Sequence, residues 1–158
     1  MIVANFITIH GYFKLKNLPS KQYFYNLHLS MKNLLLENDE VRIELEDGIL
    51  FAIWKSSFID LNIAQQAIAY RLEATGFIPY PTIINIRSVK SITKPSRDFL
   101  ASEKGSEGII AAAILIDSSL GRILGNFFIQ INKPLKPTKI FTSEIDAKKW
   151  LAKYVNKK

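Results

Sequence analysis

The stretch Gly108-Ile109-Ile110-Ala111-Ala112-Ala113-Ile114-Leu115-Ile116 carries the strongest fold signal in the sequence, because it contains no polar side chain. A strand that is apolar on both faces is typical of the centre of a parallel sheet whose two faces are covered by helices. Asp117-Ser118-Ser119 follows at once and supplies the side-chain oxygens that begin a helix. We therefore predict a central β-strand that runs directly into a helix, the repeating unit of an α/β protein.

The helix predicted after this strand has a broad apolar face. The apolar residues of this face recur at the helical spacing i, i+3, i+4, i+7, i+8 and i+11: Leu120, Ile123, Leu124, Phe127, Phe128 and Ile131. Gly121 and Gly125 lie one turn apart and leave a flat strip where another backbone, such as that of a second copy in a homodimer, can approach. A short strand over Thr138–Phe141 and a last helix after Ser143 follow. The last helix is predicted to pack Trp150, Leu151, Tyr154 and Val155 and to expose Lys148, Lys149, Lys153 and Lys157.

A β-hairpin is predicted at the other end of this region. Val41–Leu45 alternates apolar and polar residues with the strand period of two. Asp47-Gly48 is a strong signal for a two-residue turn, because both positions tolerate positive φ, and Ile49–Trp54 is the return strand. We expect the carboxylates around this turn, Glu44, Glu46 and Asp47, to be solvated.

Two strand–helix units connect the hairpin to the central strand. A helix capped by Asp60 ends at Gly76, which can adopt the left-handed conformation of a C-cap. Thr82–Arg87 reads as a strand, and a further helix starts near Thr93 and ends before Gly105. The predicted fold is α/β: a β-hairpin followed by alternating α/β units, with one mixed, mostly parallel sheet of about five strands packed with about four helices.

The first part of the chain differs from the rest. Residues 1–37 show no clean period and are predicted to be an N-terminal extension, whereas residues 38–158 form the domain. One hypothesis is that Met31 is the native start. The alternative is that residues 2–9 form a strand and residues 20–36 a helix, and that the two cap the domain.

Composition narrows the function classes. The chain has 158 residues, a formal net charge of +7, no cysteine and two histidines, His10 and His28. The absence of cysteine excludes thiol catalysis, disulfides and Cys-ligated metals. Without nucleophile–base pairs or a phosphate-binding glycine loop, we predict a non-enzymatic protein with no cofactor and no metal. No signal peptide or membrane span is evident, so we expect a cytoplasmic protein.

Four segments resemble small bacterial proteins of the STAS-like type, which combine anti-sigma-factor-antagonist and CRAL-TRIO features. They are Leu45–Leu50, Ile86–Thr93, Leu115–Phe128 and Asn132–Pro134, within a resemblance that spans Glu40–Tyr154. The resemblance implies a STAS-like fold, and its antagonist members carry a phosphorylated serine in an Asp-Ser-Ser-Gly motif at the start of the second helix. Thr93-Lys94-Pro95-Ser96 stands at that place, so the switch serine is not carried over.

The candidate site lies at the carboxyl edge of the predicted sheet, where open α/β sheets bind ligands. Helix N-termini and cations gather there, and both favour an anion. The predicted binding residues are Arg87, Lys90, Thr93, Lys94, Arg97, Asp117, Ser118, Ser119 and Arg122. The alternative is that the hydroxyls and Asp117 only cap helices and that the cations are solvated.

These features favour a regulatory or interaction module that binds a protein partner, as yet unidentified, or a small anionic ligand at this edge. The first alternative is a lipid- or hydrophobic-ligand-binding protein that uses the space beside the third helix. The second is nucleic-acid binding, which the scattered distribution of the cations disfavours.

Overall fold

The computed structural model describes residues 32–117 and 134–155, and its centre is a six-stranded sheet with the order β1-β2-β3-β5-β7-β8. The strands are β1 (Asn33–Glu37), β2 (Val41–Glu46), β3 (Ile49–Trp54), β5 (Tyr80–Asn85), β7 (Ile109–Leu115) and β8 (Thr138–Phe141). A second sheet pairs two short strands, β4 (Phe58–Ile59) and β6 (Ser91–Ile92). The described helices are α1 (Leu61–Ala74), α2 (Lys94–Ala101) and α4 (Glu144–Val155). The helix predicted after Asp117 lies outside the described residues.

The main sheet is mixed and mostly parallel, as the sequence predicted. β1, β2 and β3 pair antiparallel, whereas β3, β5, β7 and β8 pair parallel. The hairpin turn between β2 and β3 has Asp47 at φ 50° and Gly48 at φ 76°, the two positive values that a tight hairpin requires. The predicted hairpin and the alternation of strands and helices after it are therefore confirmed for the described part of the chain, with β1, β4 and β6 as additional strands.

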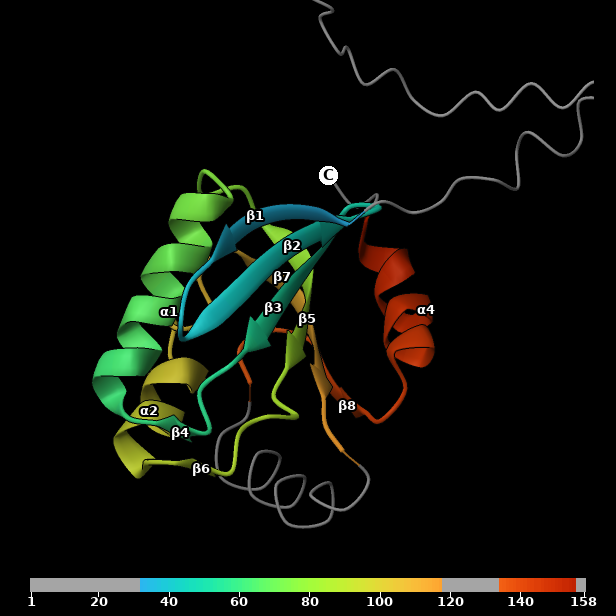
Figure 1. Cartoon of the computed structure of the whole chain (residues 1–158). Helices are drawn as coiled ribbons and strands as arrows, with labels where there is room; N and C mark the ends of the chain where they lie inside the picture. The colour runs from blue at the N-terminus through green and yellow to red at the C-terminus, as the bar shows by residue number, and fades with distance from the viewer. Residues whose placement is uncertain (1–31, 118–133, 156–158) are drawn as a thin grey trace, which may run out of the picture.

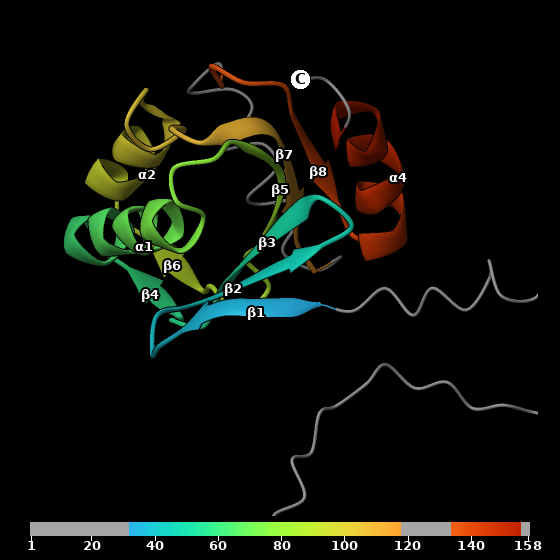
Figure 2. The same cartoon turned by 90° about the horizontal axis from the view of Figure 1, so that it is seen from above.

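Helices cover the two faces of the sheet unequally (Figures 1 and 2). On one face α1 and α2 pack on the hairpin side, with Ala64 and Ala67 of α1 in a buried cluster. On the other face α4 places Ala147 and Leu151 against β3, β5 and β7. The fully apolar β7 thus lies in the middle of the parallel part of the sheet, as its composition predicted.

Two parts of the sheets were not predicted. β1 pairs with β2, so the sheet begins at Asn33, five residues before the expected boundary at Asn38. Residues 33–36, which one alternative placed at the end of a helix, are extended instead. The run Leu34-Leu35-Leu36 has no period of two, because this edge strand is largely exposed on both faces. β4 and β6 have two residues each, too few to show a period.

The helix boundaries follow the predicted caps. The Asp60 carboxylate accepts a hydrogen bond from the Ile63 N–H at 2.9 Å, and Gly76 adopts φ 58° after the end of α1. Within residues 32–117 and 134–155, no helix is both long enough and apolar enough to cross a lipid bilayer.

Candidate functional site

Arg87 organises the carboxyl edge of the parallel strands. It lies two residues beyond the end of β5, and its Nε lies 3.4 Å from Asp117 Oδ1, beyond the end of β7. Its Nη2 donates a hydrogen bond to the Thr142 carbonyl, directly after β8, at 2.5 Å. One guanidinium group therefore connects the ends of three neighbouring strands, β5, β7 and β8. Arg87 and Asp117 lie at the same edge of the sheet, as the sequence predicted.

The Arg87–Asp117 pair is fixed but remains accessible. The side chain of Arg87 is 36% exposed and that of Asp117 52% exposed. The Asn85 side chain accepts a hydrogen bond from the Arg87 N–H at 3.1 Å, which holds the backbone of the strand end. Bonds to backbone carbonyls and to a carboxylate thus orient the guanidinium while the side chain stays partly exposed.

Thr93 is the N-cap of α2, the role that the alternative interpretation gave it. Its Oγ1 accepts a hydrogen bond from the Ser96 backbone N–H at 3.4 Å, and it lies 2.6 Å from the Ser96 hydroxyl oxygen. Ser96 is fully buried, and its hydroxyl donates to the Ile59 carbonyl at 3.2 Å. Both hydroxyls are therefore engaged in connecting α2 to β4.

The other predicted cations have separate surroundings. Lys94 Nζ lies 2.6 Å from Asp98 Oδ2 within α2, and Arg97 Nη1 donates to the Ile92 carbonyl at 2.7 Å. Lys90 is exposed, and its backbone N–H donates to the Ser57 carbonyl at 2.7 Å. Three further predicted residues lie outside the described residues: Ser118, Ser119 and Arg122.

A network of buried carboxylates on β2 corrects the expectation of a solvated turn. Glu44 is only 5% exposed and Glu46 only 6% exposed, whereas Asp47 is exposed as expected. Arg42 Nη2 lies 2.6 Å from Glu44, and Lys148 Nζ of α4 lies 2.8 Å from Glu46 Oε2. The alternation in β2 showed that these carboxylates share a face, but local sequence carried no sign that α4 covers it.

The pKa of Lys148 is raised by this network. Partial burial lowers the pKa, but the hydrogen bond and charge of Glu46, together with the charge of Glu144, raise it by more. Lys148 Nζ also lies 5.3 Å from the centre of the Phe51 ring. Lys148 was predicted to be an exposed residue of the last helix, and the structure gives it a structural ion pair instead.

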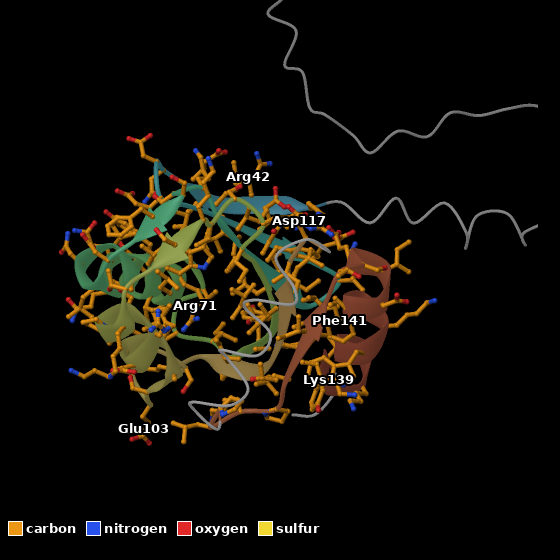
Figure 3. All side chains as sticks on the ribbon, turned by 90° about the horizontal axis from the view of Figure 1, so that it is seen from below. Arg42, Arg71, Glu103, Asp117, Lys139 and Phe141 are labelled. Carbon is orange, nitrogen blue, oxygen red and sulfur yellow. The ribbon has the colours of Figure 1, made fainter. Side chains whose placement is uncertain are left out.

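An apolar cavity of about 300 Å³ opens on the face of the sheet that carries α1 and α2. Its floor consists of apolar residues from five strands of the main sheet, β2, β3, β5, β7 and β8, including Ile43, Ile114 and Ile140. Arg71 of α1 and Lys139 of β8 also line it, but the ammonium group of Lys139 lies beside α4, 5.8 Å from the centre of the Trp150 ring (Figure 3).

Arg71 is a buried cation at this cavity that sequence reasoning missed. It is 4% exposed, and its Nη2 donates to the carbonyls of Gly105 and Glu107, at 3.3 and 2.5 Å. Burial lowers its pKa to about 10, against the opposing charge of Glu107. The available signal was its position three residues after Ile68, on the apolar face of α1.

The part of the chain that the structure describes contains no group of three or more His, Cys, Asp or Glu residues that could hold a metal ion. Glu44, Glu46 and Glu144 gather around Lys32, and Arg42 and Lys148 engage them as well. The arrangement at the carboxyl edge can offer a positioned donor, Arg87, next to an acceptor, Asp117.

Comparisons with known proteins give a family. Residues 43–155 match the family described as Domain of unknown function (DUF7793). No curated protein matches the sequence. Among solved structures, the chain is similar to an uncharacterized protein of the DUF3478 family with a SpoIIAA-like fold from Shewanella loihica PV-4. The identity is 16% and the TM-score 0.47, over 77% of this chain and 95% of that one. Since the family match spans more than half of the sequence, the chain belongs to the DUF7793 family.

Proposed function

We propose that this protein is a non-enzymatic regulatory module that binds a protein partner at the carboxyl edge of its parallel strands. The binding surface is centred on Arg87 and Asp117 and includes the exposed Lys90. The observation that carries the proposal is the Arg87 side chain, which is held by Thr142 and Asp117 yet is 36% exposed.

A fixed and exposed arginine suits an interface. Arginine is one of the residue types that dominate binding energy at protein interfaces. Ordering a long side chain on binding costs about 0.5–1.5 kcal/mol, and a side chain that is already ordered avoids much of that cost. Arg87 is ordered in this way by the ends of β7 and β8.

The neighbouring carboxylate favours a protein over a small anion. Asp117 lies 3.4 Å from Arg87 Nε, so a free anion at Arg87 would meet a negative charge. A protein surface can instead offer an acceptor to Arg87 and a donor to Asp117 at the same time. Lys90 extends the polar surface with a cation.

The nucleic-acid alternative receives less support from the charge distribution. Within residues 32–117 and 134–155, the cations with a carboxylate within 4.0 Å include Lys32, Arg42, Lys55, Arg87, Lys94 and Lys148. Cations that are neutralised within the protein release fewer counterions from a phosphate backbone.

Affinity capture from native lysate with three forms of the protein tests the proposal. Lys90→Glu reverses an exposed charge at the carboxyl edge, and Lys149→Glu makes the same change on α4, on the opposite face. We expect wild type and Lys149→Glu to retain one protein in equal amounts and Lys90→Glu to retain much less. Equal capture by all three forms, or capture of nucleic acid that both lysine variants reduce alike, contradicts the proposal.

A further inference from the structure

We propose that β1 is the contact between two copies of this protein, and that the two β1 strands pair antiparallel and join both main sheets into one. This inference goes beyond the proposed partner-binding edge and does not depend on it. It rests on the lateral position of β1 in the sheet, on its exposed leucines and on the opposite charges at its two ends.

β1 forms one lateral edge of the main sheet. It stands first in the strand order, and within residues 32–117 and 134–155 its strand neighbour is β2 alone. In Figure 2, α1 and α2 lie to one side of the sheet and α4 to the other, and none of these helices crosses the outer side of β1. The backbone N–H and C=O groups on that side are therefore placed to pair with a strand of another chain.

The middle of β1 is apolar and exposed. Leu34 is 53% exposed and Leu35 is 38% exposed, and Leu36 follows them without an intervening charge or proline. Natural edge strands often carry a charged residue or a proline at such positions, because an exposed apolar edge promotes association. The charges of this strand stand at its two ends instead, with Lys32 just before it and Glu37 as its last residue.

The two faces of β1 restrict the register of such a pair. Leu36 packs on the core cluster beside α1, whereas Glu37 and Lys32 contact charged residues on the other face of β2. Residues that lie directly opposite each other in an antiparallel pair point to the same face of the sheet. The register that places Lys32 opposite Glu37 of the second copy meets this condition. It also places Leu34 opposite Leu35 of the second copy.

The charges at the two ends of β1 are complementary in this register. Two-fold symmetry forms the contact between Lys32 and Glu37 twice, and both side chains are accessible, at 36% and 35% exposure. A parallel pair in register would instead place each of these charges beside its own copy, which like-charge repulsion disfavours. Charge complementarity therefore favours a second copy of the same strand, in antiparallel orientation, as the occupant of this edge.

The dimer leaves the carboxyl edges of both copies accessible. Arg87 lies at the ends of β5, β7 and β8, whereas the contact runs along the side of β1. Because the antiparallel pair reverses the strand direction, the two carboxyl edges face opposite ways. Two paired strands of five residues form a small interface, below the roughly 1,200 Å² at which stable complexes begin. We therefore expect a dimer that forms with rising protein concentration.

Sedimentation velocity of the full chain at increasing concentration tests the association. Leu34→Lys places a charge in the middle of β1, and Ile78→Lys is the matched control, since the two natural residues are 53% and 54% exposed. We expect wild type to shift from monomer to dimer, Leu34→Lys to raise the dissociation constant about tenfold or more, and Ile78→Lys to leave it unchanged. Circular dichroism shows whether each variant is folded, and Leu35→Lys replaces Leu34→Lys if the latter is not.

Two outcomes of this measurement overturn the proposal. One is a wild-type chain that stays monomeric at every concentration, and slow amide exchange of β1 in that monomer would indicate a cover from the same chain. The other is an equal effect of the two lysine substitutions, which would place the contact between copies elsewhere.

Disulfide trapping tests the register, because the chain contains no cysteine. When Lys32→Cys and Glu37→Cys are mixed under oxidising conditions, the two β-carbons lie about 5 Å apart in the proposed register. In a dimer of either variant alone the two cysteines are about 17 Å apart, too far for a disulfide. We expect the mixture to give a disulfide-linked dimer, and each variant alone to give much less.

The control for trapping is a mixture of Lys32→Cys with Lys149→Cys, an exposed position on α4, which should give as little linked dimer as the single variants. A linked dimer that forms as readily in this control, or in either variant alone, contradicts the register. A dimer in sedimentation without trapping between positions 32 and 37 would show that another surface joins the two copies, and would also overturn the proposal.

Discussion

Arg87 Nε and Asp117 Oδ1, 3.4 Å apart, connect the ends of two adjacent parallel strands. The same guanidinium donates to the Thr142 carbonyl, so the ends of β5, β7 and β8 have a common link. The two contacts differ in kind. The first joins two side chains that are partly exposed, and the second is a charged donor on a backbone acceptor. Stability measurements can separate them.

Replacing Arg87 should cost more than replacing Asp117. Arg87→Ala removes a charged donor from Thr142, and we expect the free energy of unfolding to fall by about 1.5 kcal/mol. Asp117→Asn removes only a solvent-screened ion pair, which is worth about 0–1 kcal/mol. Urea denaturation of the two variants measures the difference. An equal loss in both would show that the ion pair, and not the carbonyl contact, holds the strand ends.

The Lys148–Glu46 pair should stabilise the fold in a pH-dependent way. Lys148→Met leaves Glu46 buried beside the more distant Lys32, and we expect a loss of about 2 kcal/mol near neutral pH. Because folding raises the pKa of Lys148, its contribution is fully present below the ordinary pKa of 10.5 and is lost as pH rises through the folded pKa.

Unfolding at about pH 8 and about pH 11 checks this sign. We expect the difference in unfolding free energy between wild type and Lys148→Met to shrink at the higher pH. Lys149→Met, at an exposed neighbouring position, is the control and should change stability by less than about 0.5 kcal/mol. A difference that grows with pH would mean that the pKa of Lys148 is lowered on folding.

Arg71 should be required for the turn between α2 and β7. Arg71→Met keeps the volume of the side chain but leaves the buried Gly105 carbonyl and the Glu107 carbonyl without their donor. We expect a loss of about 2–3 kcal/mol and faster amide exchange in residues 105–109. Gln65→Met, at an exposed position of α1, should leave both measurements unchanged. Faster exchange throughout the protein, without a local effect, would argue against this role.

Local sequence patterns predicted the helices and strands in which buried and exposed residues alternate with a regular period. Val41–Leu45 alternates because one face of β2 packs on the core, and Asp47-Gly48 fixes the turn by its backbone conformation. Asp60 and Thr93 were identified as caps because a cap is a local interaction. β1 was missed because an exposed edge strand needs no alternation.

The candidate site could be predicted only in part. Arg87 and Asp117 meet because the carboxyl ends of parallel strands share one edge, which the element order already implied. The burial of Glu44 and Glu46 depends on Lys32 and Lys148, which are distant in sequence, so no local pattern reveals it. Arg71 was missed for a similar reason, since its carbonyl partners lie more than thirty residues away.

The most direct test of the proposed binding edge is hydrogen–deuterium exchange of the protein, free and in complex with the captured partner. We predict slower exchange in the complex for residues 86–90, for residues 116–117 and for residues 142–143, which surround Arg87. The amides of α4 should be unchanged, because this helix covers the other face of the sheet. Slower exchange confined to α4, or to α1 and the loop after it, would contradict the assignment of the carboxyl edge as the binding surface.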